Sequence, residues 1–280
     1  MLNLSLGYSP CPNDTFIFYP LVHGLIDSPG FSFSERLEDV ETLNRLALNG
    51  ELDISKISYH LLGFIRSDYC LLRSGGALGR GCGPLVVSRK YAGMEEIKGK
   101  RIAVPGRYTT ACLLLRLFDP DLDNIVFLPF HEIMGAVARG EVDAGVIIHE
   151  SRFTFPEYGL TSLLDLGDWW EKETGHPIPL GGIVAKRSLG VETVATLEQM
   201  LRLSVDYAFA HPDAANSYIR SHSQEMSDEV CAAHIGLYVN NFSRDLGKDG
   251  EAAVITLLGR AEAAGLIPRS TEPLFLPRGK

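Results

Sequence analysis

Short apolar runs typical of β-strands alternate with helical patterns over the first 120 residues of the chain. A first strand is predicted at residues 4–7, and the prolines of the turn at residues 9–14 end it. Asp14 or Thr15 can cap a helix that continues to Gly24. Such alternation is typical of βαβ units, so the pattern predicts an α/β protein with largely parallel strands.

The same order of elements occurs twice along the chain. In the first copy the strand at residues 4–7 leads through a turn into the helix that ends at Gly24, and in the second the strand at 101–104 leads through a turn into a helix at 110–118. A helix at residues 40–49 and a strand at 52–57 follow in the first copy. In both copies a helix ends at a glycine, after which Glu-x-Asp precedes a strand. Two similar α/β lobes predict a ligand cleft between them, at the carboxyl ends of their strands.

The chain becomes strongly helical after residue 191. Start and stop signals predict helices at residues 193–210, 213–221, 227–240 and 250–264. We expect this tail to pack on the first lobe, with the chain crossing between lobes near residues 87–90 and 182–186. The prediction is therefore a larger lobe of residues 1–88 and 187–280 and a smaller lobe of residues 89–186.

Composition and charge narrow the possible partners. The net charge of −9 would repel a nucleic-acid backbone, so no nucleic-acid partner is expected. The apolar runs are far shorter than the ~20 residues that span a bilayer, so we expect no membrane insertion. Five cysteines without a CxxC pair, and a first segment without the pattern of an export signal, favour a cytoplasmic location.

Common cofactor and hydrolase motifs are absent from the sequence. It contains no GxGxxG, GxxxxGK[ST], HExxH or GxSxG pattern, and its histidines lack metal-ligand spacing. The expectation is therefore no cofactor and no metal site. The glycine cluster at residues 75–83 matches none of these patterns, and it is either a structural turn or a loop that lines the cleft.

Several polar residues lie at the expected edge of the cleft. Thr109 and Thr110 form the start of a helix, where free backbone N–H groups can bind an anion, and Asn13 has the equivalent place in the first lobe. Lys56 lies at the carboxyl end of its strand and can pair with an anion. Helix capping for the first group and ordinary exposure for the lysine remain the alternatives.

His149 is the histidine best placed for chemistry. It directly follows the apolar strand at residues 143–148, at the carboxyl end of the strand. A histidine there can act as a general base, because its reference pKa of ~6.5 is close to neutral pH. A buried histidine without a catalytic role is the alternative.

Five segments of the sequence together resemble one enzyme family. They lie at residues 9–16, 38–44, 73–81, 104–110 and 147–153, and include the strings Ser-Pro-Cys-Pro-Asn-Asp-Thr-Phe and His-Glu-Ser-Arg-Phe. These strings closely resemble the 1,4-dihydroxy-6-naphthoate synthase family, which acts in menaquinone biosynthesis by the futalosine route. The likeness extends from Leu6 to about Phe275, nearly the whole chain.

The resemblance implies a two-lobed periplasmic-binding-protein-like (type II) fold, with mixed sheets flanked by helices and a ligand cleft between the lobes. It implies a cytoplasmic carbon–carbon lyase that takes cyclic dehypoxanthinyl futalosine, which bears a carboxylate, without a cofactor. His149 matches the family's proton acceptor. The residues that match its substrate-contact segments are Lys56, Ile57, Ser58, Thr109 and Thr110.

Two other functions fit the same fold. A non-catalytic solute-binding protein would use the cleft but need no base. Such proteins work outside the cytoplasm, and the first segment of the sequence lacks the pattern of an export signal, which disfavours this alternative. A chorismate dehydratase of the same pathway would share the architecture, but the strings at residues 9–14 and 149–152 resemble the synthase.

Overall fold

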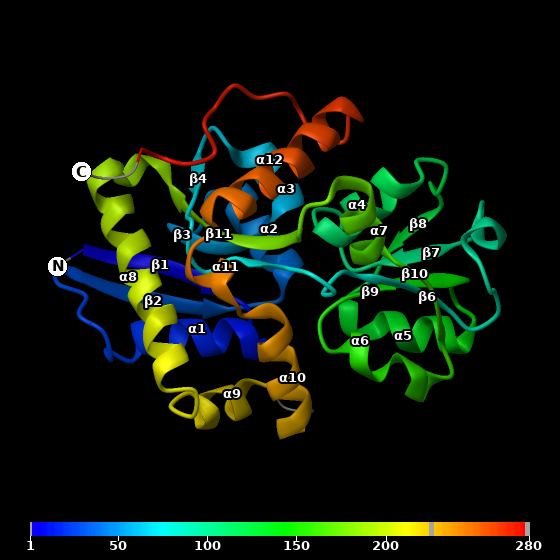
Figure 1. Ribbon diagram of the computed structural model, residues 1–280, viewed down its shortest axis with the longest axis horizontal. Helices are drawn as coiled ribbons and strands as arrows, with labels where there is room; N and C mark the ends of the chain where they lie inside the picture. The colour runs from blue at the N-terminus through cyan, green and yellow to red at the C-terminus, as the bar shows by residue number, and fades with distance from the viewer. Residues whose placement is uncertain (1, 224–226, 278–280) are drawn as a thin grey trace.

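The computed structural model describes residues 2–223 and 227–277. Its strands form two mixed sheets in two lobes that lie side by side (Figure 1). Met1 and residues 278–280, which belong to the predicted larger lobe, and residues 224–226 lie outside the described residues.

The first lobe is built on a six-stranded sheet in the order β2-β1-β3-β11-β4, with β5 also paired to β11. The strands β1, β2 and β3 are parallel, and the long β11 runs antiparallel to β3, β4 and β5. The bounds of these strands are β1 (Leu2–Tyr8), β2 (Phe31–Leu37), β3 (Ile54–Ser58), β4 (Tyr69–Leu71), β5 (Ala77–Gly79) and β11 (Ile178–Lys186).

The second lobe contains a five-stranded sheet in the order β10-β6-β9-β7-β8. Its strands β9, β7 and β8 are parallel, whereas β6 and β10 are antiparallel to their neighbours. The bounds of these strands are β6 (Leu85–Ser88), β7 (Ile102–Val104), β8 (Ile125–Phe127), β9 (Ala144–Ile147) and β10 (Thr161–Asp165).

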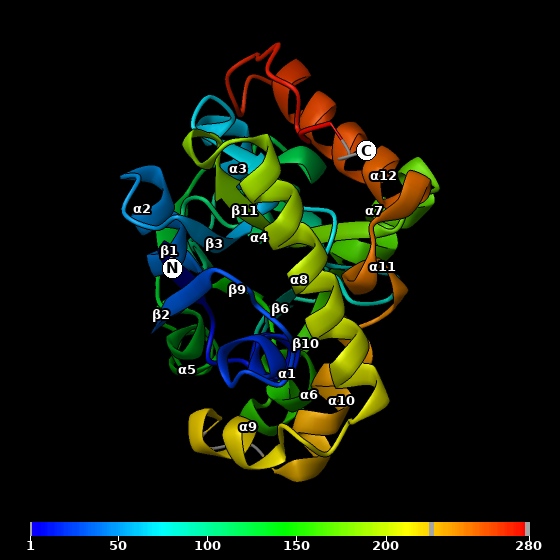
Figure 2. The ribbon, with the colours of Figure 1, turned by 90° about the vertical axis from the view of Figure 1, so that its left-hand side faces the viewer.

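Helices cover both faces of each sheet (Figures 1 and 2). In the first lobe α1 packs against α8, α9 and α10, whereas α12 packs against α3 and β11. In the second lobe α5 packs on β9 and β7, and α4 and α7 cover the opposite face. The helix bounds are α1 (Pro12–Val22), α2 (Val40–Leu48), α3 (Tyr59–Ile65), α4 (Thr110–Phe118), α5 (Phe130–Arg139), α6 (Ser151–Thr154), α7 (Leu166–Thr174), α8 (Val191–Ala210), α9 (Asn216–His222), α10 (Asp228–Tyr238), α11 (Asn241–Arg244) and α12 (Gly247–Ala263).

Side-chain alternation along the strands divides the core. On β11, Ile183 and Ala185 join the cluster beneath α1 and α8, whereas Val184 faces the cluster of α3 and α12. That second cluster continues into the other lobe through α4 and α7, so the two lobes share apolar packing on this side. None of the described helices is both long enough and apolar enough to cross a membrane.

The predicted lobe crossings are wrong by several residues. The segments predicted as crossings overlap β6 and β11, and each of these strands lies wholly in one sheet. The chain instead changes sheet at residues 80–84, within the glycine cluster, and at residues 175–177, which read Gly-His-Pro. Glycine and proline mark such connections, while apolar strands pair within a sheet.

Candidate active site

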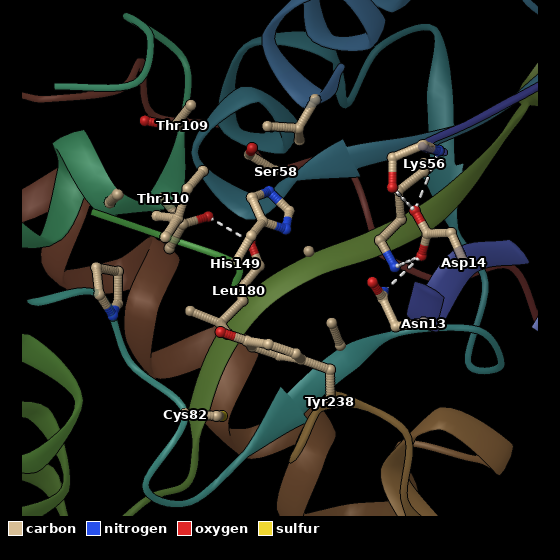
Figure 3. A pocket seen from close by; sticks show the side chains of 17 residues that line it. Asn13, Asp14, Lys56, Ser58, Cys82, Thr109, Thr110, His149, Leu180 and Tyr238 are labelled. Atoms are coloured by element: carbon tan, nitrogen blue, oxygen red, sulfur yellow. Dashed lines mark hydrogen bonds and ion pairs between the residues drawn. The ribbon is translucent and has the colours of Figure 1, made fainter. Parts of the chain in front are cut away.

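A cavity lies between the two lobes. It occupies the kind of cleft in which α/β proteins commonly bind ligands, at the carboxyl ends of the strands. Its wall includes residues of both lobes and of the first crossing segment (Figure 3): Ser9, Asn13, Asp14, Val40, Lys56, Ser58, Ala77, Cys82, Pro84, Thr109, Thr110, Ala111, Ile148, His149, Leu180, Gly181 and Tyr238. The cleft predicted between the lobes is therefore present, and the glycine cluster contributes Ala77 and Cys82 to it.

His149 reaches this cavity from the second lobe, two residues beyond the end of β9. Its backbone φ of 56° lies in the left-handed region, the one such value among the non-glycine residues that the structure describes. This conformation costs roughly 1–2 kcal/mol, so the surrounding contacts must hold it. Its ring lies 5.2 Å from the ring of Phe130 and stacks parallel to that of His234 at 5.9 Å.

The charge environment of His149 favours its protonated form. Burial lowers the pKa of the imidazole, but the Cys11 sulfur, 3.5 Å from Nδ1, raises it, as do the carboxylates of Glu150 and Asp14. The result is a pKa of about 9. His149 is therefore mainly protonated at neutral pH, because this pKa lies above the reference value of ~6.5 expected from the sequence, and it acts as a strong base only in its neutral form.

Lys56 and Asp14 form a buried ion pair at the wall of the cavity. Lys56 Nζ lies 2.8 Å from Asp14 Oδ1 and 3.3 Å from the carbonyl oxygen of Gly75. The hydroxyl of Ser9 donates to the other Asp14 oxygen at 2.7 Å. Lys56 is therefore neutralised by Asp14 and keeps one N–H group for a ligand, because an ammonium has three donors.

The prediction that Asp14 or Thr15 caps the first helix is wrong. The N-cap residue of α1 is Cys11, and the helix begins at Pro12, which suits a first helical position because it lacks an N–H group. Asp14 lies in the first turn, where its carboxylate binds Lys56 and Ser9 rather than the end of the helix.

Asn13 connects this ion pair to a second buried histidine. Its Nδ2 donates to Asp14 Oδ1 at 2.8 Å, and its Oδ1 lies 2.9 Å from Nε2 of His234, on α10. Since a carboxylate only accepts, the Asn13 oxygen must face His234, whose Nε2–H donates to it. Burial lowers the pKa of His234, as do the charges of His149 and Lys56, so this ring is neutral.

Ser58 lines the cavity at the end of β3. Asn44, buried on α2, donates from Nδ2 to Ser58 Oγ at 3.1 Å and accepts from the Ser58 N–H group at 2.9 Å. The Ser58 hydroxyl accepts from Asn44 and keeps its own hydrogen for a ligand. Ile57 was predicted to contact substrate, but its side chain is fully buried in the core, because neighbouring residues on a strand face opposite sides.

Thr109 and Thr110 start α4, as predicted, but their hydroxyls are already used. Thr109 caps the helix by accepting from the Cys112 N–H group, and it donates to the carbonyl oxygen of Gly106. Thr110 donates to the Leu180 carbonyl oxygen at 2.6 Å. The N–H groups of Thr110 and Ala111 have no partner in the described chain, so backbone groups provide the anion-binding donors here.

Sequence reasoning missed several residues of the site. Asn44, His234 and Tyr238 lie on predicted helices rather than at strand ends, where the site was expected, and Ala111 offers only its backbone. The string Glu-Asp-Val-Glu-Thr-Leu-Asn at residues 38–44 was the available signal for Asn44. Across the described ranges no group of three or more His, Cys, Asp or Glu side chains is arranged to bind a metal ion.

Solved structures with the same architecture define the class of protein. An Archaeoglobus fulgidus protein matches with a TM-score of 0.88 and 38% identity, covering 95% of this chain and 98% of its own. The alkanesulfonate-binding protein of Xanthomonas axonopodis matches with a TM-score of 0.69 and 15% identity, covering 95% of this chain and 94% of its own. The fold is thus that of periplasmic binding proteins, here with a histidine in the cleft between the lobes.

Sequence comparisons identify the family. The family model described as menaquinone biosynthesis matches residues 4–263, so the chain belongs to the menaquinone biosynthesis family. Two similar relatives carry the name 1,4-dihydroxy-6-naphthoate synthase. The Thermus thermophilus protein is 54% identical, covering 98% of this chain and 99% of its own, and the Streptomyces coelicolor protein is 49% identical, covering 95% of each.

Proposed function

We propose that this protein forms 1,4-dihydroxy-6-naphthoate from cyclic dehypoxanthinyl futalosine, with His149 as the general base. The observation that carries the proposal is His149 itself, held in the inter-lobe cavity within reach of free donors from both lobes. The named relatives and the family support the product, and the resemblance of the His149 segment to the family's proton acceptor supports the role of the histidine.

The chemistry begins with a proton next to the substrate ketone. Neutral His149 accepts this proton, and the electron pair of the broken C–H bond forms an enolate. Cleavage of a carbon–carbon bond in a retro-aldol-type step then releases a three-carbon fragment of the sugar. A sugar hydroxyl gives up its proton and becomes the carbonyl of the fragment, and the electron pair of the broken bond stays with the remaining ring, which becomes aromatic. The protein is thereby a carbon–carbon lyase, and these steps need only an acid–base group.

The free donors of the cavity bind the anionic oxygens of the substrate. The Ser58 hydroxyl and the Thr110 and Ala111 N–H groups are available to the carboxylate or to the enolate oxygen. A donor of this kind typically contributes about 3–4 kcal/mol when it acts on charge that develops in the transition state. Lys56 offers a further N–H group in the same cavity.

The free cysteines and the position of the cavity between the lobes are consistent with a biosynthetic enzyme of the cytoplasm. The five cysteines are all free thiols in the structure, as in a reducing compartment. Enclosure between two lobes protects an enolate from water.

Turnover by the purified protein tests the proposal directly. Cyclic dehypoxanthinyl futalosine is supplied without nucleotide, and 1,4-dihydroxy-6-naphthoate is followed by mass spectrometry for the wild type and His149→Asn. Asparagine is preferable to alanine because it tolerates the left-handed backbone at this position. We expect product from the wild type and a loss of about 10²-fold or more in the variant.

The control is His211→Asn, an exposed histidine next to Tyr207 and outside the cavity. Equal turnover by wild type and His149→Asn would remove His149 from the role of base. No turnover, combined with tight ligand binding, would favour a solute-binding protein. Stabilisation by chorismate and not by the futalosine derivative in a thermal-shift assay would favour a chorismate dehydratase.

A further inference from the structure

Cys11 lies at a helix start where its side chain serves no capping function. It is the N-cap residue of α1, a position that favours Ser, Thr, Asp or Asn, and its thiol accepts no hydrogen bond from the helix. The side chain is 8% exposed. Its one hydrogen-bond partner among the described residues is Nδ1 of His149, which comes from the opposite lobe, at 3.5 Å.

The contacts of His149 fix how its ring is turned. Phe130 and His234 pack against the ring, and Nδ1 faces Cys11. Nε2 has no partner within the part of the chain that the structure describes, and the ring lines the cavity (Figure 3). Nε2 is therefore the nitrogen available to a substrate.

Whether the hydrogen between Nδ1 and the Cys11 sulfur is bonded to the ring or to the sulfur then decides whether His149 can act as a base. A neutral imidazole carries one N–H group, and the other nitrogen accepts. If the Cys11 S–H group donated to Nδ1, the hydrogen of the ring would be on Nε2, and this nitrogen could not accept a proton. If Nδ1–H donates to the Cys11 sulfur, Nε2 is free to act as the base.

We propose that Cys11 is a positioning residue for His149. Its sulfur accepts a hydrogen bond from Nδ1–H, selects the tautomer with an unprotonated Nε2 toward the cavity, and stabilises the imidazolium that forms when Nε2 takes the substrate proton. This inference rests on the proposed role of His149, and it gives the cysteine the place that a carboxylate has in other base-orienting arrangements.

The charged surroundings of the ring agree with this assignment. Cys11 is the largest of the influences that raise the pKa of His149, ahead of Glu150 beside it in the chain and Asp14 on α1. His234 on α10 is neutral, and Lys56 on β3 is paired with Asp14. Removal of the sulfur leaves burial as the main influence, and burial lowers the pKa.

The titration of His149 in the free protein tests the inference without relying on turnover. The ring proton signals of His149, assigned with His149→Asn, are followed by NMR against pH in the wild type, Cys11→Ala and Cys11→Ser. We expect a midpoint near the pKa of about 9 in the wild type. In Cys11→Ala the midpoint should fall to or below the reference value of ~6.5. In Cys11→Ser the hydroxyl still accepts from Nδ1–H, so an intermediate midpoint is expected.

The pH profile of kcat/KM adds a second readout. We expect the acid limb to move downward with the NMR midpoint in Cys11→Ala, together with a loss of maximal rate of about tenfold or more. Cys70→Ala, a buried cysteine on β4 outside the cavity, should leave both unchanged. If Cys11→Ala does not fold, Cys11→Ser carries the test.

Midpoints and acid limbs equal to those of the wild type in the folded Cys11 variants overturn the inference. Because the NMR titration needs no substrate, it gives this answer even if the protein acts on a different molecule. If the wild type shows no turnover, but the NMR midpoints of the wild type and the Cys11 variants differ as expected, only the proposed function is contradicted.

Discussion

At the scale of single residues, the cavity is notable for how few of its polar hydrogens are free. The hydroxyls of Thr109 and Thr110 donate to backbone carbonyl oxygens, and Lys56 uses two of its three N–H groups within the protein. Ser58 differs, because Asn44 donates to its oxygen and leaves its hydrogen unused. This side chain is therefore one hydroxyl donor that we expect a substrate anion to meet, beside the Tyr238 hydroxyl that also lines the cavity.

Replacing Ser58 by alanine tests this assignment. A hydrogen bond to a charged group contributes roughly 1.5–3 kcal/mol. We therefore expect KM to rise by about tenfold or more, since each ~1.4 kcal/mol is a factor of ten. If Ser58 binds the carboxylate alike in ground and transition states, kcat stays nearly constant, whereas a fall in kcat assigns it to the enolate oxygen.

Ser55→Ala is the matched control for this experiment. Ser55 is a buried serine on the same strand, its hydroxyl donates to the Lys56 carbonyl oxygen, and it does not line the cavity. Steady-state kinetics of both variants give the comparison. Kinetic constants for Ser58→Ala equal to those of Ser55→Ala would exclude a role for the Ser58 hydroxyl in binding.

At the scale of secondary-structure elements, the first turn of α4 depends on Thr109. Its hydroxyl accepts from the Cys112 N–H group at 3.2 Å, while the N–H groups of Thr110 and Ala111, which line the cavity, have no partner among the described residues. Thr109→Ala should lower the free energy of unfolding by about 1 kcal/mol, the usual cost of a lost N-cap.

Urea titration followed by tryptophan fluorescence measures this change. Thr109→Ser keeps the capping oxygen and should retain most of the stability. An alanine variant as stable as the wild type would show that the cap makes no net contribution, and that the helix start is held by packing alone.

The elements with strong local signals could be predicted from the sequence, and those defined by pairing could not. The helix at α4 begins at Thr110 and ends at Phe118, the residues predicted. The strand β2 was missed, because Glu35 interrupts the apolar face that Phe31, Phe33 and Leu37 form. The lobe crossings were displaced because strand pairing, which no single segment reveals, decides the sheet to which a strand belongs.

At the scale of the whole molecule, the candidate active site forms where distant parts of the chain meet. Cys11, His149 and His234 come from α1, the end of β9 and α10, and more than 80 residues separate each from the next. The sequence indicated His149 and Asn13 individually, through strand ends and turns. It contained no signal that Asn13 contacts His234 or that Cys11 contacts His149, because both contacts depend on how the lobes and the helical tail pack.

Glu41 connects the two lobes beside the cavity. On α2 of the first lobe, its carboxylate accepts from the Arg107 N–H group at 3.0 Å and from the Tyr108 N–H group at 3.2 Å, both in the second lobe. The same oxygen that binds Tyr108 also accepts from Asn44, the partner of Ser58. The contact between lobes and the donor in the cavity are thereby parts of one hydrogen-bonded chain.

The ionised carboxylate of Glu41 lowers the stability of the folded protein, because burial disfavours its charge. Burial raises the pKa of Glu41, although hydrogen bonds from Asn44, Tyr108 and Arg107 oppose the rise. A carboxyl whose pKa is higher in the folded than in the unfolded protein favours folding below the unfolded value, and this contribution is lost as pH rises through the folded value. The charge therefore serves the contact between lobes rather than the stability of the fold.

Glu41→Gln separates these two effects. The amide cannot ionise, so the melting temperature of the variant relative to wild type should increase from pH 4 to pH 7, as measured by differential scanning fluorimetry. At the same time KM should rise, because the neutral amide holds the second lobe more weakly beside Ser58. Glu41→Asp keeps the charge but shortens the reach to Arg107 and Tyr108, so it should raise KM without gaining stability at pH 7. A melting-temperature difference between Glu41→Gln and wild type that stays constant with pH would show that the Glu41 carboxylate is not penalised by burial.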